Sequence, residues 1–581
     1  MPRLLLPALL LWLSIAAGAG ALEVRQTLWG FDGRVVPGRM SPFSVLLANP
    51  GNAPFDGEVV LRQLGGLGGH SGAPYVQAVY LAPRSERWVQ FHAFMDSSAH
   101  EFALSWGRGA KERVELDAPA AGPPARVLLS DPDNPFAAGG SLKVFPDQLF
   151  PTTVAATDSL DAVALDYAPR WEPARREAFL DWLRRGGLVL VLASLNGEFP
   201  VFGEQLDVLN FSGDSARVGA GTVLRAKAGR RQAGEQLFAG RGFPAPELKQ
   251  QKEVAVYQLE QTLFERLARM TRPNIHWWLI NTLTAVYLLI IGPAHYRWGR
   301  KIDYRLSILA FLGTVALFGW LFSVIGRRGY GESQTVHSLA IARSLGAGRH
   351  DVTQWISAFA TRGDLYTLTH RAPANLYAAV SMEAINGQIV NGKDGRFIAD
   401  IPLYSSRQFV HRAALPGDDP GVTIEAWEAT DLHLQKLVLQ AGPQFPKEVL
   451  EIRARFREGF FELQQKGDRL VLPGHARRQT FGEFLPRQRV QTHSYDPGLY
   501  AASMDGNKAS LEVFRRALPL LYVRAMNGHA YFPQALDYPP MPGDVLELYV
   551  FARAPESFGL QGKGFARENG FVLYVQKVFK P

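Results

Sequence analysis

Two long apolar runs near the middle of the sequence restrict what the chain can form. Residues 275–294 and 306–325 each provide twenty consecutive positions without Asp, Glu, Lys or Arg. At about 1.5 Å of rise per residue, a helix of that length spans the roughly 30 Å hydrocarbon core of a bilayer. Aromatic residues lie at or near the ends of both runs, as in the interfacial belts of membrane proteins: Trp277, Trp278, Tyr296, Trp298, Tyr304 and Trp320. We therefore predict a hairpin of two transmembrane helices; a pair of buried core helices is the alternative.

The segment that joins the two runs, residues 295–305, is basic. Arg297, Arg300, Lys301 and Arg305 face a single acid, Asp303. Because cytoplasmic loops carry an excess of Lys and Arg, we expect this loop in the cytoplasm. Both large flanking parts of the chain then lie outside the cytoplasm, on a bacterial inner membrane.

The amino terminus independently predicts export. Arg3 is followed by an apolar stretch and by the small residues Ala19, Gly20 and Ala21, which together resemble a signal peptide over residues 1–21. The segment is either cleaved before Leu22 or retained as an anchor. In both cases the chain that follows is exported.

Composition excludes several classes of function. The 581 residues include no cysteine, so disulfides, thiolate metal sites and cysteine nucleophiles are ruled out. The net charge of +8 is spread along the chain without a dense Lys/Arg tract, which argues against a nucleic-acid partner. No His-based metal motif occurs, and His337, His350, His370, His411 and His433 show no ligand spacing. We expect no cofactor and no metal.

Periodicity divides the flanking parts into domains. Short alternating runs over residues 22–120 predict a β-sandwich. Within residues 125–246, a helix is predicted over residues 173–185, with Pro173 in its first turn and Gly186-Gly187 at its end, and an unbroken apolar strand over residues 188–193. The succession of strand, helix and strand predicts an α/β domain with a flavodoxin-like parallel sheet. Residues 247–274 follow as a partly amphipathic juxtamembrane helix. Residues 329–581 return to short alternating runs and predict a mostly β domain, as one sandwich or two.

Any ligand site is expected in the α/β domain, because parallel sheets bind ligands at the carboxyl ends of their strands. Asp131, Asp133, Asp166 and Ser194 each follow a predicted strand and form a candidate ligand edge. The carboxylates can hold a divalent cation or do acid–base work, or they can form ordinary turns. No histidine occurs between His100 and His276, so a Ser–His or Cys–His pair is excluded within this domain. We predict no catalytic residue there.

The hairpin carries small and polar side chains with a packing role. Gly313, Ala316 and Gly319 lie on roughly one side of the second run and are expected to let the two helices approach closely. The first run contains Asn281, Thr282 and Thr284, which can bond to its partner helix. We also expect the two exported bodies to dock beside each other, with residues 247–270 and 327–332 at their junction.

Two stretches resemble known families. The segment LFPTTVAATDSLDAVALDYAPRWEPARREAFLDWLRRGGLVLVLAS resembles class I glutamine amidotransferase-like domains. The segment YLLIIGPAHYRWGRK resembles the Gly-Pro-x-x-Tyr signature of an uncharacterised family of large bacterial membrane proteins, which similarly open with a strand like Leu28-Trp29-Gly30-Phe31. In the amidotransferase family a catalytic Cys follows the strand that here ends at Ala193, and His and Glu complete the triad. This chain departs at Cys and His, so that activity is not implied.

The resemblance implies a role in the cell envelope. It suggests partners of the MoxR-type ATPase or von Willebrand factor A kind, and a similar domain occurs in auxiliary subunits of gliding-type ABC transporters. We therefore expect a non-catalytic, membrane-anchored envelope scaffold or interaction protein. The alternatives are an accessory subunit of an ABC-type transporter and a metal-dependent hydrolase that uses Asp131, Asp133 and Asp166.

Overall fold

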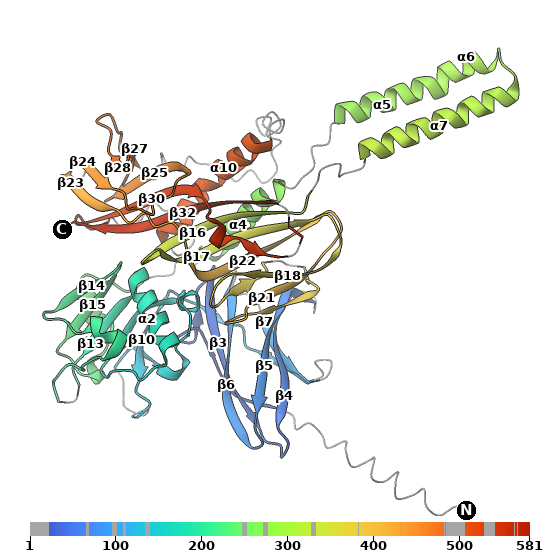
Figure 1. Cartoon of the computed structure of the whole chain (residues 1–581). Coiled ribbons are helices and arrows are strands. Elements are labelled where there is room, and N and C mark those ends of the chain that lie inside the picture. The colour runs from blue at the N-terminus through green and yellow to red at the C-terminus, as the bar shows by residue number, and fades with distance from the viewer. Residues whose placement is uncertain are drawn as a thin grey trace, which may run out of the picture.

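A computed structural model describes most of the chain after the predicted signal peptide, which lies outside the described residues. The described residues are 22–65, 69–95, 101–107, 112–133, 140–194, 196–246, 252–270, 277–326, 333–380, 383–430, 433–480, 483, 506–527, 541–562, 564–565 and 567–580. We call residues 22–246 the first body and residues 333–580 the second body. A helical hairpin between them projects from one end of the molecule (Figure 1).

The first body begins as the predicted two-layer β structure. One layer is a three-stranded antiparallel sheet in the order β1 (Glu23–Trp29), β3 (Arg39–Asn49) and β6 (Ser85–Met95). The other layer contains β4 (Phe55–Leu64), β5 (His70–Leu81), β7 (Glu101–Trp106) and β8 (Glu112–Leu116). A short parallel pair, β2 (Arg34–Val35) and β9 (Ala120–Ala121), closes the domain towards its linker.

The second layer does not end within the first body. Strand β5 has a parallel partner in the second body, β20 (Gly387–Val390), with Tyr75 opposite Ile389. The sheet continues through β21 (Arg396–Ile401), β18 (Asp364–His370) and β31 (Leu560–Gln561), so that eight strands from both bodies form one sheet. Residues 22–120, which the sequence pattern predicts to be a separate domain, therefore share a sheet with the carboxyl-terminal half.

A single hydrophobic core lies under this shared sheet. Trp29, Phe43 and Phe102 of the first body pack in the same cluster as Tyr377 and Phe409 of the second. The Trp29 and Phe43 rings are 4.1 Å apart, and the Tyr377 and Phe409 rings 6.1 Å apart, between centroids. The two bodies dock as expected from the sequence, but through a common core rather than only at the membrane junction.

The α/β domain has a six-stranded sheet. Its order is β11 (Lys143–Pro146), β10 (Ala125–Ser130), β12 (Leu160–Leu165), β13 (Leu188–Leu192), β15 (Gly221–Ala226) and β14 (Ser215–Val218). All neighbours are parallel except β14 with β15. Counted along the chain, the five parallel strands follow the flavodoxin-like order 2-1-3-4-5. An amidotransferase-like domain is not confirmed by this order, which many unrelated proteins share.

Local sequence explains helix α2 and strand β13 of this domain. Helix α2 (Pro173–Arg185) has Pro173 in its first turn and ends at Gly186, whose φ of 133° suits glycine. Strand β13 is buried along its whole length. Its Val189 and Val191 pack into the core beneath α2, and its Leu190 into a second core on the other face. Short helices complete the domain: η2 (Asp147–Leu149), η3 (Val154–Thr157), η4 (Glu204–Leu209), η5 (Arg230–Gln232) and α3 (Glu235–Ala239).

The second body is built on a nine-stranded sheet. Its order is β19 (Leu376–Ala378), β22 (Ser405–Pro416), β17 (Arg349–Ala360), β16 (Thr335–Gly346), β32 (Arg567–Phe579), β30 (Val545–Arg553), β25 (Val449–Phe456), β26 (Gly459–Glu462) and β29 (Gln479–Thr480). A four-stranded sheet follows the order β23 (Thr423–Ala429), β24 (Leu434–Gln440), β28 (Arg469–Val471) and β27 (Gln464–Lys466), and η7 (Glu556–Phe558) lies beside the large sheet.

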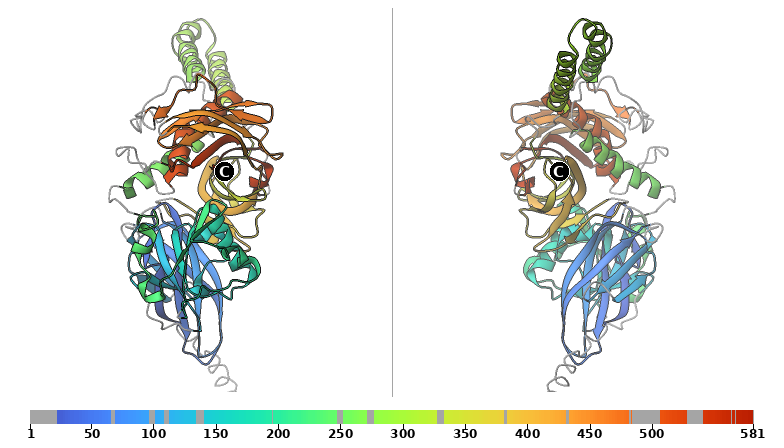
Figure 2. Two further views of the ribbon diagram at one scale, coloured as in Figure 1. Left: turned by 90° about the vertical axis from the view of Figure 1, so that its left-hand side faces the viewer. Right: turned by 90° about the vertical axis from the view of Figure 1, so that its right-hand side faces the viewer.

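Two helices cover one face of the nine-stranded sheet (Figure 2). They are α4 (Lys252–Arg269), from the predicted juxtamembrane segment, and α10 (Gly506–Asn527). Leu263 and Leu267 of α4 and Phe514 of α10 are fully buried in one cluster with residues of the sheet. Helix α4 therefore packs on the second body, whereas the sequence predicts a juxtamembrane helix that leads to the first membrane span.

The hairpin consists of α5 (Trp277–Leu289), a π-helical turn η6 (Ile290–Ala294), α6 (His295–Gly299) and α7 (Tyr304–Gly326). Pro293 lies inside the π turn, as expected where proline removes a helical hydrogen bond. Two helices, Trp278–Gly299 and Tyr304–Ile325, are long and apolar enough to span a membrane, and 0% and 6% of their apolar windows are buried. The alternative of buried core helices does not describe them.

Two details of the hairpin differ from expectation. The first helix continues through residues 295–299, so the turn is shorter than the predicted loop 295–305. Gly313 and Gly319 face open space, where an added Cβ would meet nothing within 4 Å. Aromatic rings join the helices instead: Tyr287 lies 5.1 Å from Phe318 between centroids. Thr284 donates to the Ile280 carbonyl of its own helix.

Candidate functional site

The predicted ligand edge follows the carboxyl ends of β10, β12 and β13. Asp131 accepts a bond from the Asp133 backbone N–H at 3.0 Å, which is the turn geometry weighed as the alternative. Asp133 is exposed and lies 3.4 Å from Arg170 Nη1. Ser194 forms a turn in which its N–H donates to the Glu198 carbonyl at 2.8 Å.

Asp166 is held by a buried arginine. Arg230 Nη1 lies 2.8 Å from Asp166 Oδ1, and Arg230 Nη2 donates to the Leu129 carbonyl at 2.9 Å. Nearby, Tyr167 donates to Asp147 Oδ2 at 3.0 Å, and burial raises the pKa of the Asp147 carboxyl. Among the residues that the structure describes, no group of three His, Asp or Glu side chains could hold a metal. The three aspartates of the hydrolase alternative therefore do not converge on a cation.

Four histidines in the described part of the chain are buried: His337, His350, His370 and His411. His370 and His411 stack with ring centroids 3.7 Å apart. His370 Nδ1 lies 3.0 Å from the Tyr377 hydroxyl, and His411 Nδ1 lies 2.8 Å from Gln354 Oε1. Burial lowers the pKa of His411 well below its ordinary value, and the neighbouring His370 lowers it further. These contacts lie in the buried interior of the second body.

A cavity of about 580 Å³ lies at the opposite edge of the α/β sheet. Its wall in the first body is formed at the amino ends of the strands, by Asp158 and Leu160 at β12, Gly187 before β13 and Ala220 before β15. Strands β16, β17, β22 and β32 and helix α10 of the second body form the other wall. We call this space the interdomain cavity. Cavities between domains are common ligand sites.

A buried ion-pair network joins the two walls. Asp351 of β17 is 0% exposed and accepts two bonds from Arg412 Nη2, at 2.9 and 3.0 Å. Arg185, at the end of α2, reaches across to Asp351 Oδ2 at 2.9 Å. Asp158 lies 3.4 Å from Arg185 and 3.3 Å from Arg412. The network thus connects α2 to two strands of the second body.

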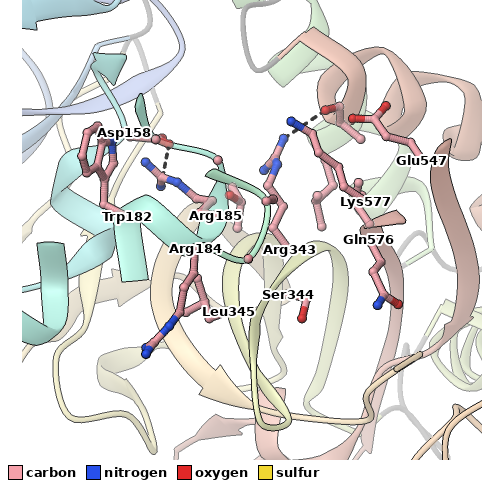
Figure 3. A pocket seen from close by; sticks show the side chains of 18 of the residues that line it. Asp158, Trp182, Arg184, Arg185, Arg343, Ser344, Leu345, Glu547, Gln576 and Lys577 are labelled. Atoms are coloured by element: carbon pink, nitrogen blue, oxygen red, sulfur yellow. Dashed lines mark hydrogen bonds and ion pairs between the residues drawn. The ribbon is translucent and has the colours of Figure 1, made fainter. Parts of the chain in front are cut away.

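Further arginines surround this ion-pair network. Burial opposes ionisation of Asp158, but Arg412, Arg185 and Arg39 outweigh it and hold the pKa of that carboxyl far below its usual value. Burial lowers the pKa of Arg39 to about 9; Asp158 partly offsets this, whereas Arg524 and Arg185 lower the pKa further. Figure 3 shows Arg343 between Arg185 on one side and Lys577 on the other.

Small residues shape the cavity wall beside α2. Gly186 and Gly187 end the helix, and Gly219 lies opposite with a φ of 61°. A Cβ on Gly187 would lie 2.6 Å from the Trp182 ring, and one on Gly219 would lie 2.9 Å from the Arg184 carbonyl oxygen. Glycines are therefore required for the close packing that leaves this space open.

Sequence reasoning missed this site because its residues come from distant segments. Arg39, Asp158, Arg343, Arg412 and Arg524 are far apart along the chain and have no motif spacing. The one available signal was Leu183-Arg184-Arg185-Gly186-Gly187, where two cations precede a glycine pair. From the sequence, that pattern predicts the end of a helix and belongs to the segment that resembles amidotransferase-like domains.

Comparisons with known proteins name no relative. No protein-family model matches the sequence, and no curated protein does. Solved structures show only slight likeness. An alkylpurine DNA glycosylase, AlkC, from Pseudomonas fluorescens is 13% identical over 18% of this chain and 32% of that chain, with a TM-score of 0.14. The chain thus spans about a third of that protein.

Two carbohydrate-active enzymes match over more of the chain. A cycloisomaltooligosaccharide glucanotransferase from Paenibacillus sp. is 8% identical over 79% of this chain and 98% of that chain, with a TM-score of 0.17. A family 2 glycosyl hydrolase from Bacteroides cellulosilyticus is 10% identical over 77% of this chain and 70% of that chain, with a TM-score of 0.14. Scores this low assign neither a fold family nor an activity.

Proposed function

We propose that this protein is a non-catalytic scaffold or interaction protein of the bacterial cell envelope. In this proposal the hairpin spans the inner membrane, and both bodies form one head on its outer side. The amidotransferase-like segment serves as a recognition surface without the Cys and His that glutamine hydrolysis needs. The resemblance to the uncharacterised envelope family, with its MoxR-type and von Willebrand factor A partners, supports the choice of compartment.

The shared eight-stranded sheet is the observation that carries the proposal. Tyr75 precedes the hairpin and Ile389 follows it, yet the two residues are paired in one sheet. Strands on opposite sides of a bilayer cannot pair, so this pairing supports a topology with both bodies on the same side. An even number of spans satisfies this requirement, and two exposed apolar helices supply it. The export-like amino terminus and the basic turn favour the outer side.

Reporter fusions test the topology. We expect alkaline phosphatase to be active when it is fused after residue 581 and inactive when it is fused in the turn at residue 301. A fluorescent protein that needs the cytoplasm to fold should give the reverse pattern at the same two positions. Phosphatase activity at residue 301 together with inactivity at residue 581 would place the head in the cytoplasm and overturn the proposal.

Partner capture tests the scaffold role. The full chain, tagged after residue 581 and cross-linked in native membranes, is purified in detergent and its companions are identified by mass spectrometry. We expect at least one envelope protein in stoichiometric amount. Recovery of the chain without any stoichiometric companion would contradict a scaffold, whatever the fusions show.

A further inference from the structure

The interdomain cavity holds more positive charge than its own carboxylates balance. Three charged residues that line the cavity form ion pairs with residues that do not line it, and they are left out of the charge count. These pairs are Arg184 with Asp181, Asp161 with Arg126, and Glu547 with Arg455. Arg39 donates to the Asp158 carbonyl and is not counted further. Five other cations remain on or beside the cavity: Arg185, Arg343, Arg412, Arg524 and Lys577. In the described part of the chain, three carboxylates pair with them: Asp158, Asp351 and Glu260. Arg343 and Lys577 are left without a carboxylate among these groups.

The ion pairs do not account for two of these cations. Arg185 and Arg412 are bound by Asp158 and Asp351 at 2.9–3.4 Å. Arg343 instead donates to the Ala525 carbonyl at 3.1 Å, which satisfies a hydrogen bond but balances no charge. Lys577 is exposed at the rim and has no ion pair among the residues that the structure describes. A network that only joined the two bodies would not need these side chains.

Arg524 supplies an independent observation. Its side chain is 7% exposed and lines the cavity. Its Nη2 contacts the Gly38 carbonyl and lies 3.5 Å from Glu260 Oε1, whereas its Nη1 has no hydrogen-bond partner in the described structure. An unsatisfied buried donor is costly and calls for an acceptor. An anion in the cavity provides one.

Size and surroundings indicate what kind of anion fits. A volume of about 580 Å³ exceeds that of a single chloride or sulfate and suits a small organic molecule. Guanidinium groups bind carboxylate and phosphate oxygens with paired hydrogen bonds. Trp182, Leu345 and Phe579 add apolar surface to the lining. The hairpin leaves the molecule on the other side from the α/β domain, so a soluble ligand fits better than a lipid headgroup (Figure 1).

We propose that the interdomain cavity binds a small, soluble, multivalent oxyanion, a phosphate-bearing or polycarboxylate molecule, between Arg343, Arg524 and Lys577. The ligand contacts both bodies at once and supplies the negative charge that the interface lacks. Its binding holds the α/β domain against the second body. Anion binding at this site can be measured whatever the membrane topology and without a protein partner.

Calorimetry on the full chain in detergent tests the site. Pyrophosphate and citrate are titrated separately at an ionic strength fixed with sodium chloride, and the two arms distinguish phosphate from carboxylate chemistry. We expect saturable binding of at least one anion and a higher Tm in its presence. Arg343→Gln should raise the Kd about 10-fold, the effect of roughly 1.4 kcal/mol. Lys577→Gln should raise it about 3-fold, because an exposed charge is partly screened.

Lys580 provides a matched control. It is an exposed lysine three residues after Lys577 that does not line the cavity. Lys580→Gln should leave the Kd unchanged. Neither Lys577→Gln nor Lys580→Gln removes a buried contact, so both variants should fold and keep the comparison valid. The proposal is wrong if neither anion binds above the sodium chloride baseline, or if Lys577→Gln and Lys580→Gln bind equally.

Discussion

Asp351 links three segments that are far apart in the sequence. It is 0% exposed, and it binds Arg185 of the first body and Arg412 of its neighbouring strand β22. Charges buried to this degree are tolerated only because they are paired with good geometry. Removing one partner leaves the other charges buried without a counter-charge. The loss of a partner therefore destabilises the fold by more than the intact pairs stabilise it.

Replacing Asp351 by Asn should therefore destabilise the protein strongly. We expect Asp351→Asn to cost about 3–5 kcal/mol, the usual penalty for leaving buried partner charges unpaired. Urea unfolding followed by tryptophan fluorescence measures the loss. Asp544→Asn is the control, because Asp544 also pairs across the two bodies, with Arg217 at 2.6 Å, but both side chains are about half exposed. Its cost should stay below about 1 kcal/mol. Equal costs would show that burial is irrelevant here.

Buried histidines should make the head sensitive to acid. Burial lowers the pKa of His92 and His337 to about 4 and that of His370 to about 3. Below the ordinary histidine pKa, near 6.5, the unfolded chain binds protons that the folded chain does not. The free energy of unfolding should therefore fall as pH drops from 6.5 towards 4, by up to roughly 1.4 kcal/mol per pH unit for each histidine.

Urea unfolding at several pH values checks this slope. His370→Gln should flatten it, whereas His433→Gln, a change at an exposed position, should not. A stability that stays constant between pH 6.5 and 4 in the parent protein would contradict the neutral, buried state of these rings.

At the scale of elements, the sequence predicted what local pattern determines. Helix α2 has the predicted bounds 173–185, because a first-turn proline and a terminal glycine pair define both ends. Strand β13 has a buried residue at every position, as its unbroken apolar run indicated. The apolar hairpin also follows directly from its composition.

Partners of each element were harder to predict than the elements. The apolar face of α4 fits a protein surface as well as a membrane surface, and only the fold shows that Leu263 and Leu267 pack on the second body. The stripe of Gly313, Ala316 and Gly319 suggested a helix contact, but Tyr287 and Phe318 form it instead. Likewise, the carboxyl-end aspartates were visible in the sequence, whereas the interdomain cavity depends on long-range contacts that no periodicity encodes.

At the scale of the whole molecule, the shared sheet makes the two bodies depend on each other. The core that contains Trp29 and Phe43 is completed by Tyr377, Phe397 and Phe409 of the second body. Within the first body, by contrast, the α/β sheet has hydrophobic clusters on both faces that come almost entirely from residues 125–243. The α/β domain is therefore the more self-contained of the two parts.

Fragments of the chain should behave accordingly. We expect residues 125–246 to give a cooperative thermal transition by circular dichroism, because their two cores stay intact. Residues 22–120 should melt without cooperativity or aggregate, since strand β5 loses β20 and exposes a sheet edge. A cooperative transition of residues 22–120 close to that of the full chain would show that the second body is not needed.

The pairing of Tyr75 with Ile389 also sets an order of events during biosynthesis. A ribosome adds about 5–20 residues per second, so Tyr75 precedes its partner by roughly 15–60 s. During that interval strand β5 has an open edge. In the proposed topology the apolar hairpin enters the bilayer before β20 can follow, so the edge stays unpaired while the chain crosses the membrane. That topology predicts that a chaperone which binds unpaired strands on the outer side of the membrane acts on this protein before β20 emerges.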